Sequence, residues 1–348
     1  MNSFSPTEYR PRFTGGHRQT LYAWARRRHF PNLPVPVERF FDVAPDARVL
    51  AHTHAHPGVP RQTLILLHGL EGSSMAHYMR GISDKAWAAG WNVVRLNQRN
   101  CGGTERLSRG LYHSGLTHDV HFVMRELLER DAVPAVAVAG YSLGGNLALK
   151  LAGELGDAVP AGLAAVCAVS PTMDLAACVE ALERTSNRAY EWNFVRNLKG
   201  RMRRKVAAFP GLFPLDPLSR IRTVRQFDET YTAPHHGFRD ADDYYHRASA
   251  LRVVDRIRVP ALIITAEDDP FVPASTFRAP AITSNPNIAL VVTPHGGHCA
   301  YLERGDESYD GYWAEREIVR FIGHQAARAR DAASAACQSP DLSQILRA

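Results

Sequence analysis

The stretch Ala139-Gly140-Tyr141-Ser142-Leu143-Gly144-Gly145-Asn146 lies between an apolar run and a series of helix-forming residues. The run before it, residues 135–139, is short and partly β-branched, which is typical of a buried parallel strand. Residues 147–152, which follow, favour a helix. The pattern G-x-S-x-G between a strand and a helix is typical of a nucleophile elbow, a turn tight enough to require glycine beside the serine. Ser142 is therefore a candidate nucleophile, and the alternative is a serine that only caps the helix.

Strand and helix patterns alternate on both sides of this turn, which predicts a mostly parallel central sheet with helices on both faces. An opening hairpin is expected at the start of the sheet, with strands at 38–43 and 48–54. The later strands are expected at 63–67, 91–96, 162–169, 261–265 and 288–293, and helices at 79–89 and 117–130, the second capped by Thr117.

The alternation stops between residues 175 and 250, where helical segments rich in arginine and aromatic residues follow one another. No strand pattern interrupts them before Pro260, so we expect an inserted helical cap over the carboxyl end of the sheet. Such a lid shapes a substrate pocket and shields it from water. Two basic runs, residues 26–28 and 199–205, are interpreted as solvated helix surfaces.

Two later strand ends offer partners for Ser142. The strand at 261–265 leads to Asp269, and the last strand leads to His298. Both side chains are expected at the same edge of the sheet as Ser142, and the order Ser, Asp, His resembles that of α/β-hydrolases. The pattern predicts that His298 accepts the Ser142 proton and that Asp269 orients the imidazole and stabilises its charged form.

Other acids and histidines stand close enough to be alternatives. Asp269 is preferred because the proline after it holds its backbone extended, while Asp268 and Asp174 remain alternatives. His298 is preferred because two glycines precede it, with His295 as the alternative. We interpret His68, His113 and His118 as structural. The alternating His52, His54 and His56 lack a nearby acid or cysteine at ligand spacing, so we expect a polar strand face and no metal site.

The loop after the strand at 63–67 begins His68-Gly69-Leu70. A His-Gly turn at a strand end upstream of the elbow is what an oxyanion hole in this architecture requires. Its glycine lets the backbone N–H of Leu70 point to the same place as the N–H of Leu143. Two such donors would stabilise the oxyanion of a tetrahedral intermediate.

Composition limits the class of protein. The chain has 348 residues, of which 45% are hydrophobic and 22% charged, as in ordinary globular proteins that bury a large core. The net charge of +6 accompanies no basic and aromatic recognition motif, so we expect weak attraction to anionic membrane surfaces and no nucleic-acid binding. No signal peptide or apolar run of membrane-spanning length is seen. Five scattered cysteines favour a reduced, cytoplasmic protein.

Six motifs together make the chain similar to a known group. It resembles the AB hydrolase 4 family of the AB hydrolase superfamily, which includes bacterial YheT-like esterases and eukaryotic lipid hydrolases and acyltransferases. The motifs are H-x-Q-T-L at 17–21, H-G-L-E-G-S at 68–73, Y-H-S-G at 112–115, G-Y-S-L-G-G-N at 140–146, A-E-D-D-P-F at 266–271 and G-G-H at 296–298. The resemblance implies an α/β-hydrolase fold and a serine carboxylesterase or lipase-like activity, with Ser142, Asp269 and His298 as the charge relay.

The expected organisation is a single α/β-hydrolase domain with its core at about 38–174 and 251–325. The cap is expected at 175–250, an N-terminal extension at 1–36 and a C-terminal tail at 326–348. The expected function is hydrolysis of carboxylic esters, acyl lipids included, through an acyl-enzyme and without a metal or organic cofactor. Alternatives are acyl transfer to an alcohol by the same triad and, less favoured, a non-catalytic binding protein. The sequence gives no oligomeric state.

Overall fold

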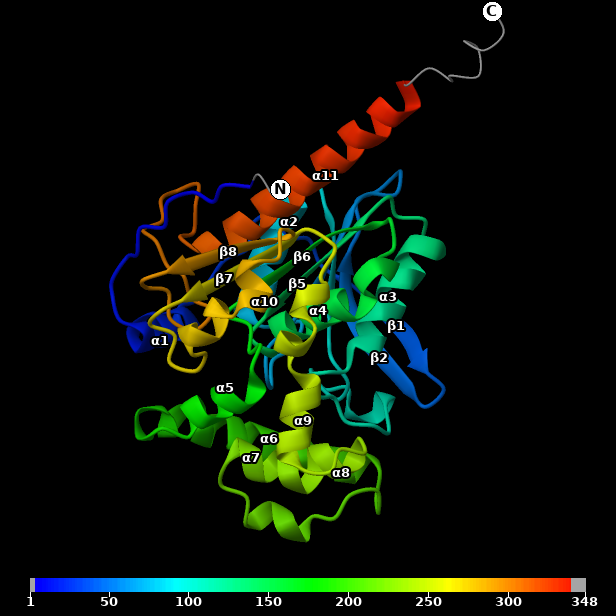
Figure 1. The fold of residues 1–348 in the computed structure, drawn as a ribbon. Helices are drawn as coiled ribbons and strands as arrows, with labels where there is room; N and C mark the ends of the chain where they lie inside the picture. Colours follow the sequence, from blue (N-terminus) through cyan, green and yellow to red (C-terminus); the bar gives the residue numbers. More distant parts are fainter. Residues whose placement is uncertain (1–3, 339–348) are drawn as a thin grey trace, which may run out of the picture.

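An eight-stranded sheet forms the centre of the computed structural model, which describes residues 4–338 (Figure 1). Its strand order is β1-β2-β4-β3-β5-β6-β7-β8. Strand β2 pairs antiparallel with both β1 and β4, and all other neighbouring strands are parallel. The mostly parallel sheet is therefore confirmed. Its strands are β1 Val37–Ala44, β2 Ala47–His54, β3 Thr63–Leu67, β4 Asn92–Leu96, β5 Val136–Tyr141, β6 Leu163–Val169, β7 Ala261–Ala266 and β8 Ile288–Thr293.

Helices cover both faces of this sheet, as expected (Figure 1). Helices α2 (His77–Ala88) and α11 (Trp313–Gln338) pack on one face, and α3 (Thr117–Glu129), α4 (Leu143–Leu155) and α10 (Pro280–Thr283) pack on the other. All five residues of β3 are buried, and alternate side chains enter opposite cores: Leu64 and Leu66 on the α2 and α11 side, Ile65 and Leu67 on the other. A continuous apolar run is stable there because both faces are covered.

Helices and the turns between them make up the chain between β6 and β7, a fully described stretch that contains no strand. These helices form a layer apart from the sheet (Figure 1). Their apolar residues join the same core cluster as α3 and α4. The inserted helical cap is confirmed. Its main helices are α5 Leu175–Leu182, α6 Arg188–Ala208, α7 Val224–Phe227, α8 Ala233–His235 and α9 Ala241–Ala248.

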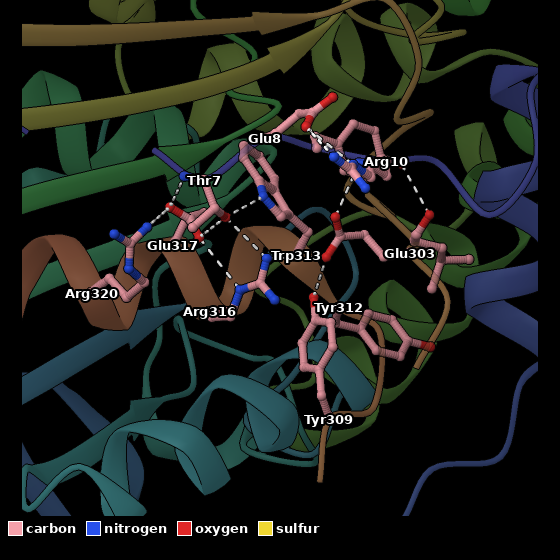
Figure 2. Close-up of polar contacts among 12 residues, drawn as sticks. Thr7, Glu8, Arg10, Glu303, Tyr309, Tyr312, Trp313, Arg316, Glu317 and Arg320 are labelled. Carbon is pink, nitrogen blue, oxygen red and sulfur yellow. Dashed lines mark hydrogen bonds and ion pairs between the residues drawn. The ribbon is translucent and has the colours of Figure 1, made fainter. Parts of the chain in front are cut away.

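The segment before the sheet packs against the core. Thr7 donates from its backbone N–H and its hydroxyl to the buried carboxylate of Glu317 in α11, and Trp313 donates its indole N–H to the Thr7 hydroxyl (Figure 2). Helix α1 (Gly16–Ala25) follows. At the other end, α11 continues through the buried Ala326, past the position where the tail was expected to begin.

Both basic runs differ from the expectation of solvated helix surfaces. Helix α1 ends at Ala25, and the Arg28 side chain is 2% exposed, paired with Asp310 and Glu315. In α6, Arg201 and Lys205 are also buried, although Arg203 and Arg204 between them are exposed. The solvated interpretation was wrong for the buried members, because each finds a carboxylate or carbonyl partner far away in the sequence.

The expected cap of α3 was also wrong. Leu116 occupies the N-cap position, and the Thr117 hydroxyl instead donates to the carboxylate of Glu154 on α4. The hydroxyl therefore links two neighbouring helices rather than closing the first turn of its own.

Candidate active site

The elbow between β5 and α4 places Ser142 at the carboxyl end of the sheet. Ser142 has φ 54°, a left-handed conformation that is strained for a residue with a side chain. The turn is tight because a Cβ on Gly144 would lie 2.3 Å from the carbonyl oxygen of Leu67, and one on Gly140 would lie 2.0 Å from that of Gly144. The Ser142 side chain makes no capping hydrogen bond to α4, so the capping alternative does not describe this serine.

His298 and Asp269 meet above the ends of β8 and β7. The Nδ1 of His298 lies 2.9 Å from Oδ2 of Asp269, whose side chain has no exposed surface. Two backbone N–H groups, from Phe271 and Val272, donate to the other carboxylate oxygen at 2.9 and 3.0 Å. The carboxylate is thus held by the loop that carries it and is aimed at the imidazole.

The electrostatic balance at His298 favours the charged form. Burial works against the imidazolium, but the neighbouring Asp269 carboxylate outweighs it, and the pKa of His298 is raised above that of an ordinary histidine. The ring of Phe271 packs edge-on against the imidazole at 4.7 Å between centroids. The pair is therefore both oriented and shielded from water.

One cavity joins these groups under the cap. Ser142 and His298 both line it, together with Leu70 and Leu143. The remaining wall is mostly apolar and comes from the cap. The structure therefore brings the predicted serine, histidine and oxyanion-hole residues to the wall of one cavity.

The loop carrying Leu70 is held by two tyrosine side chains, one from α2 and one from the segment before α3. The Gly69 N–H donates to the hydroxyl of Tyr78 at 3.0 Å, and the Glu71 N–H donates to the hydroxyl of Tyr112 at 3.1 Å. A Cβ on Gly69 would lie 3.2 Å from the Cβ of Ser142, so the loop rests directly on the elbow. Leu143 is the first residue of α4, and its N–H therefore has no acceptor within the helix.

The alternative acids have other partners. Asp268 lies 3.2 Å from Nδ1 of His295 and accepts from the Gly297 N–H at 2.9 Å. Asp174 caps α5 by accepting from the Ala177 N–H. Asp268 thus holds the loop that carries His298, and Asp174 closes the first turn of α5.

The three histidines interpreted as structural have different surroundings. His68 is fully buried, and its Nε2 accepts from the Gln98 N–H. His113 stacks among His236, Phe238 and Tyr244, and burial lowers its pKa strongly. His118 is an exposed residue of α3. Of these three, only His113 reaches the cavity, as part of its wall.

No group of three or more histidine, cysteine or acidic side chains that could hold a metal occurs in the described part of the chain. The three alternating histidines of β2 and its end are engaged separately. His52 bonds the hydroxyl of Ser74, His54 contacts the guanidinium of Arg95, and His56 stacks on Trp87 at 3.6 Å.

Two further residues at the site were not predicted from the sequence motifs. Thr20 on α1 accepts a hydrogen bond from the His298 N–H at 2.8 Å and donates to the Gly16 carbonyl. The H-x-Q-T-L motif contained it, but nothing in the motif says which loop it touches. Arg201 of α6 lines the cavity and pairs with Glu71 at 2.9 Å. A signal was present, because Arg201 falls in the stripe of buried positions shared by Leu198 and Met202.

A family described as alpha/beta hydrolase fold matches residues 62–305. The chain belongs to this α/β-hydrolase family. It is 34% identical over 318 residues to YheT of Escherichia coli (strain K12), a proposed esterase, covering 89% of this chain and 91% of that protein. It is 31% identical over 244 residues to the phospholipase ABHD3 of Mus musculus, covering 70% of this chain and 59% of that one. These relatives confirm the resemblance drawn from the motifs.

A solved structure shows the same fold. The esterase Pf2001 of Pyrococcus furiosus superposes on this α/β-hydrolase with a TM-score of 0.57 at 16% identity, covering 91% of this chain and 99% of the other. In residues 4–338, none of the helices of this α/β-hydrolase is both long and apolar enough to span a bilayer.

Proposed function

We propose that this α/β-hydrolase cleaves carboxylic esters with Ser142 as nucleophile, His298 as general base and acid, and Asp269 as the group that orients the histidine. The observation that carries the proposal is that the buried Asp269 carboxylate lies 2.9 Å from Nδ1 of His298. His298 in turn lines the same cavity as Ser142. The bond to Asp269 leaves Nε2 as the imidazole nitrogen for proton transfer. The esterase and phospholipase names of relatives agree with this chemistry.

The reaction proceeds in two halves. His298 removes the Ser142 proton as Oγ attacks the ester carbonyl carbon, and the oxygen that becomes negative is bound by the N–H groups of Leu70 and Leu143. The bond from carbon to the alkoxy oxygen then breaks, and His298 gives its proton to the departing alcohol. Water, deprotonated by His298, attacks the acyl-enzyme and releases the acid and Ser142.

The cavity wall indicates where the acyl group lies. Its cap-derived part is mostly aliphatic and aromatic, although Arg201, Asp228 and Thr232 also belong to it. The apolar side chains bind hydrocarbon by removing it from water. We therefore place an acyl chain under the cap and the alcohol group nearer the opening, and acyl lipids belong to this substrate class. The residues concerned are Leu182, Phe194, Leu198, Val224 and Phe227.

Ester hydrolysis and acyl transfer differ only in what attacks the acyl-enzyme. We expect purified protein to hydrolyse p-nitrophenyl acyl esters and Ser142→Ala to lose this activity by a factor of about 10³ or more. Ser114→Ala is the matched control, because Ser114 also lines the cavity. With added ethanol, free acid as the main product supports the hydrolase, whereas ethyl ester as the main product assigns acyl transfer. Equal rates for wild type and Ser142→Ala would refute the mechanism.

We also place the enzyme in the cytoplasm. Cys101, Cys167, Cys178 and Cys299 are all free thiols, which supports a reducing compartment.

A further inference from the structure

A second hollow lies on the other side of the segment that contains the Y-H-S-G motif. Its wall includes His113 and Gly115 of that segment, and His113 also lines the active-site cavity. The hollow is an open groove with a volume of about 520 Å³. That is within the size range of small-molecule sites. No step of the proposed ester hydrolysis uses it.

The groove is lined by an excess of positive charge. Four cationic side chains and His246 face it, against the single carboxylate of Glu154, and the four are Lys150, Arg247, Arg252 and Arg256. Glu154 is already engaged by the Lys150 ammonium at 2.7 Å. Arg247 forms an ion pair with Asp243, an acid that does not line the groove, with 3.2 Å between Nη1 and Oδ2. Across residues 4–338, neither Arg252 nor Arg256 has a carboxylate partner, so two guanidinium charges are left without a counter-ion.

The donors of the groove point to an acceptor ligand. Arg252 lies 3.1 Å from Nδ1 of His246 through its Nη1. A guanidinium has only donors, so Nδ1 must accept, and the proton of a neutral His246 is on Nε2. A ligand in this groove therefore meets N–H donors from arginine, lysine and histidine. Such a set selects an anion with several oxygen acceptors.

The groove is also held rigidly in place. Asn146 of α4 donates its amide to the carbonyls of Ser114 and Ala248 and accepts from the Ala250 N–H. A Cβ on Gly153 would lie 2.3 Å from the carbonyl oxygen of Val253, so the turns carrying Arg252 and Arg256 pack directly on α4. Lys150 is on the same helix. The walls are thus fixed by α4, the helix that directly follows Ser142, and little ordering is needed on binding.

We propose that this groove is a binding site for a phosphate group, held chiefly by Arg252, Arg256 and His246. Two guanidinium charges without a counter-ion match the charge of a phosphate monoester near neutral pH, and each planar guanidinium can bond two phosphate oxygens at once. The phosphate can belong to a soluble ester or to a lipid headgroup, since both present negatively charged, unesterified phosphate oxygens.

The test measures binding with inorganic phosphate, glycerol 3-phosphate and vesicles. Wild type is titrated with each soluble anion by calorimetry, against sodium chloride of equal ionic strength. Co-sedimentation compares vesicles of phosphatidylglycerol and phosphatidylcholine with vesicles of phosphatidylcholine alone. The variant is Arg252→Gln with Arg256→Gln, and the control is Arg203→Gln with Arg220→Gln, which removes the same charge from exposed cap positions.

We expect saturable binding by wild type and by the cap control, weakened about ten-fold or more in the groove variant. Binding of the soluble anions assigns a soluble phosphate ester, and binding confined to phosphatidylglycerol vesicles assigns a lipid headgroup. Both mutated groove arginines are exposed, so the variant should keep its circular dichroism spectrum and melting temperature in phosphate-free buffer. The single Arg256→Glu change provides a second measurement. Equal binding by wild type and both groove variants, or no response beyond that to sodium chloride, would overturn the proposal.

Discussion

The backbone N–H of His298 donates to the side-chain hydroxyl of Thr20, at 2.8 Å, across 278 positions of the sequence. The same hydroxyl donates to the Gly16 carbonyl, so helix α1 holds the loop that carries the histidine. A Cβ on Gly297 would lie 2.5 Å from that Gly16 carbonyl oxygen. An element far away in the sequence thereby holds the backbone of the residue that carries the imidazole.

Replacing Thr20 with valine should slow ester hydrolysis. Valine keeps the shape but leaves the His298 N–H without an acceptor, which costs about 1–3 kcal/mol and lets the loop shift. We expect kcat to fall about ten-fold with little change in KM, and Thr20→Ser to restore most of it. Because Thr20 positions His298, the acid limb of the pH profile should move in Thr20→Val. Loss of folding stability without any change in kcat or in that limb would contradict a positioning role.

The buried pair of Arg201 and Glu71 joins the cap to the loop that carries Leu70. Both side chains are under a tenth exposed, and the guanidinium also lies over the ring of Tyr112 at 4.3 Å. Removing one partner leaves a buried charge, which costs about 3–5 kcal/mol of unfolding free energy. We expect Arg201→Met and Glu71→Gln each to destabilise strongly, and the double variant to lose clearly less than the sum. Urea unfolding of the four proteins measures this. Additive losses would show that the two side chains are not coupled.

The glycines of the elbow are predicted to tolerate no side chain. Gly144→Ala places a methyl group 2.3 Å from a backbone oxygen of β3, which cannot move without disturbing the sheet. We expect loss of activity and a fall in stability of more than about 2 kcal/mol. Gly323→Ala in α11 is the control, because a Cβ there meets nothing within 4 Å. That change should be neutral or stabilise by up to about 1 kcal/mol. Similar unfolding midpoints for the two variants would contradict the packing described for the elbow.

Asp228 makes stability depend on pH. It lines the cavity wall, and burial raises its pKa from 3.8 to about 6, although the hydroxyls of Thr232 and Tyr245 donate to it. Between these two values the native state binds more protons than the unfolded chain, so stability falls as pH rises. The cost, up to about 3 kcal/mol, is complete above about pH 6 and absent below about pH 4.

Asp228→Asn cannot ionise and should escape this cost. We expect its unfolding free energy, relative to wild type, to improve by about 1–3 kcal/mol between about pH 4 and about pH 7.5. Asp255→Asn, at an exposed position, should show no such trend. A difference between Asp228→Asn and wild type that does not vary with pH would show that Asp228 ionises normally.

Much of the sheet was predictable from the sequence because its strands are apolar runs between turn-forming residues. The bounds of β3 and β8 are those expected, since each run is short and uninterrupted. The placement of the candidate site residues at the ends of strands was also predictable. Ser142, Asp269 and His298 stand in local motifs, and the direction of parallel strands brings such positions to one edge.

What could not be predicted depends on partners distant in the sequence. A run of basic residues shows charge but not which of its members will meet a buried acid, and Arg28 meets Asp310 and Glu315 only after α11 has folded onto the core. Threonine is a residue type that favours helix N-caps, yet the hydroxyl of Thr117 donates to the carboxylate of Glu154 on the neighbouring helix. Tertiary contacts of this kind override local propensity.

Reaction with a fluorophosphonate probe shows whether Ser142 is the activated nucleophile of this protein. The probe phosphonylates an activated serine with loss of fluoride, and peptide mass spectrometry locates the adduct. We expect a single adduct on Ser142, strongly reduced in His298→Gln and absent in Ser142→Ala. An adduct on another residue, or labelling of Ser142 that does not depend on His298, would contradict the proposed mechanism.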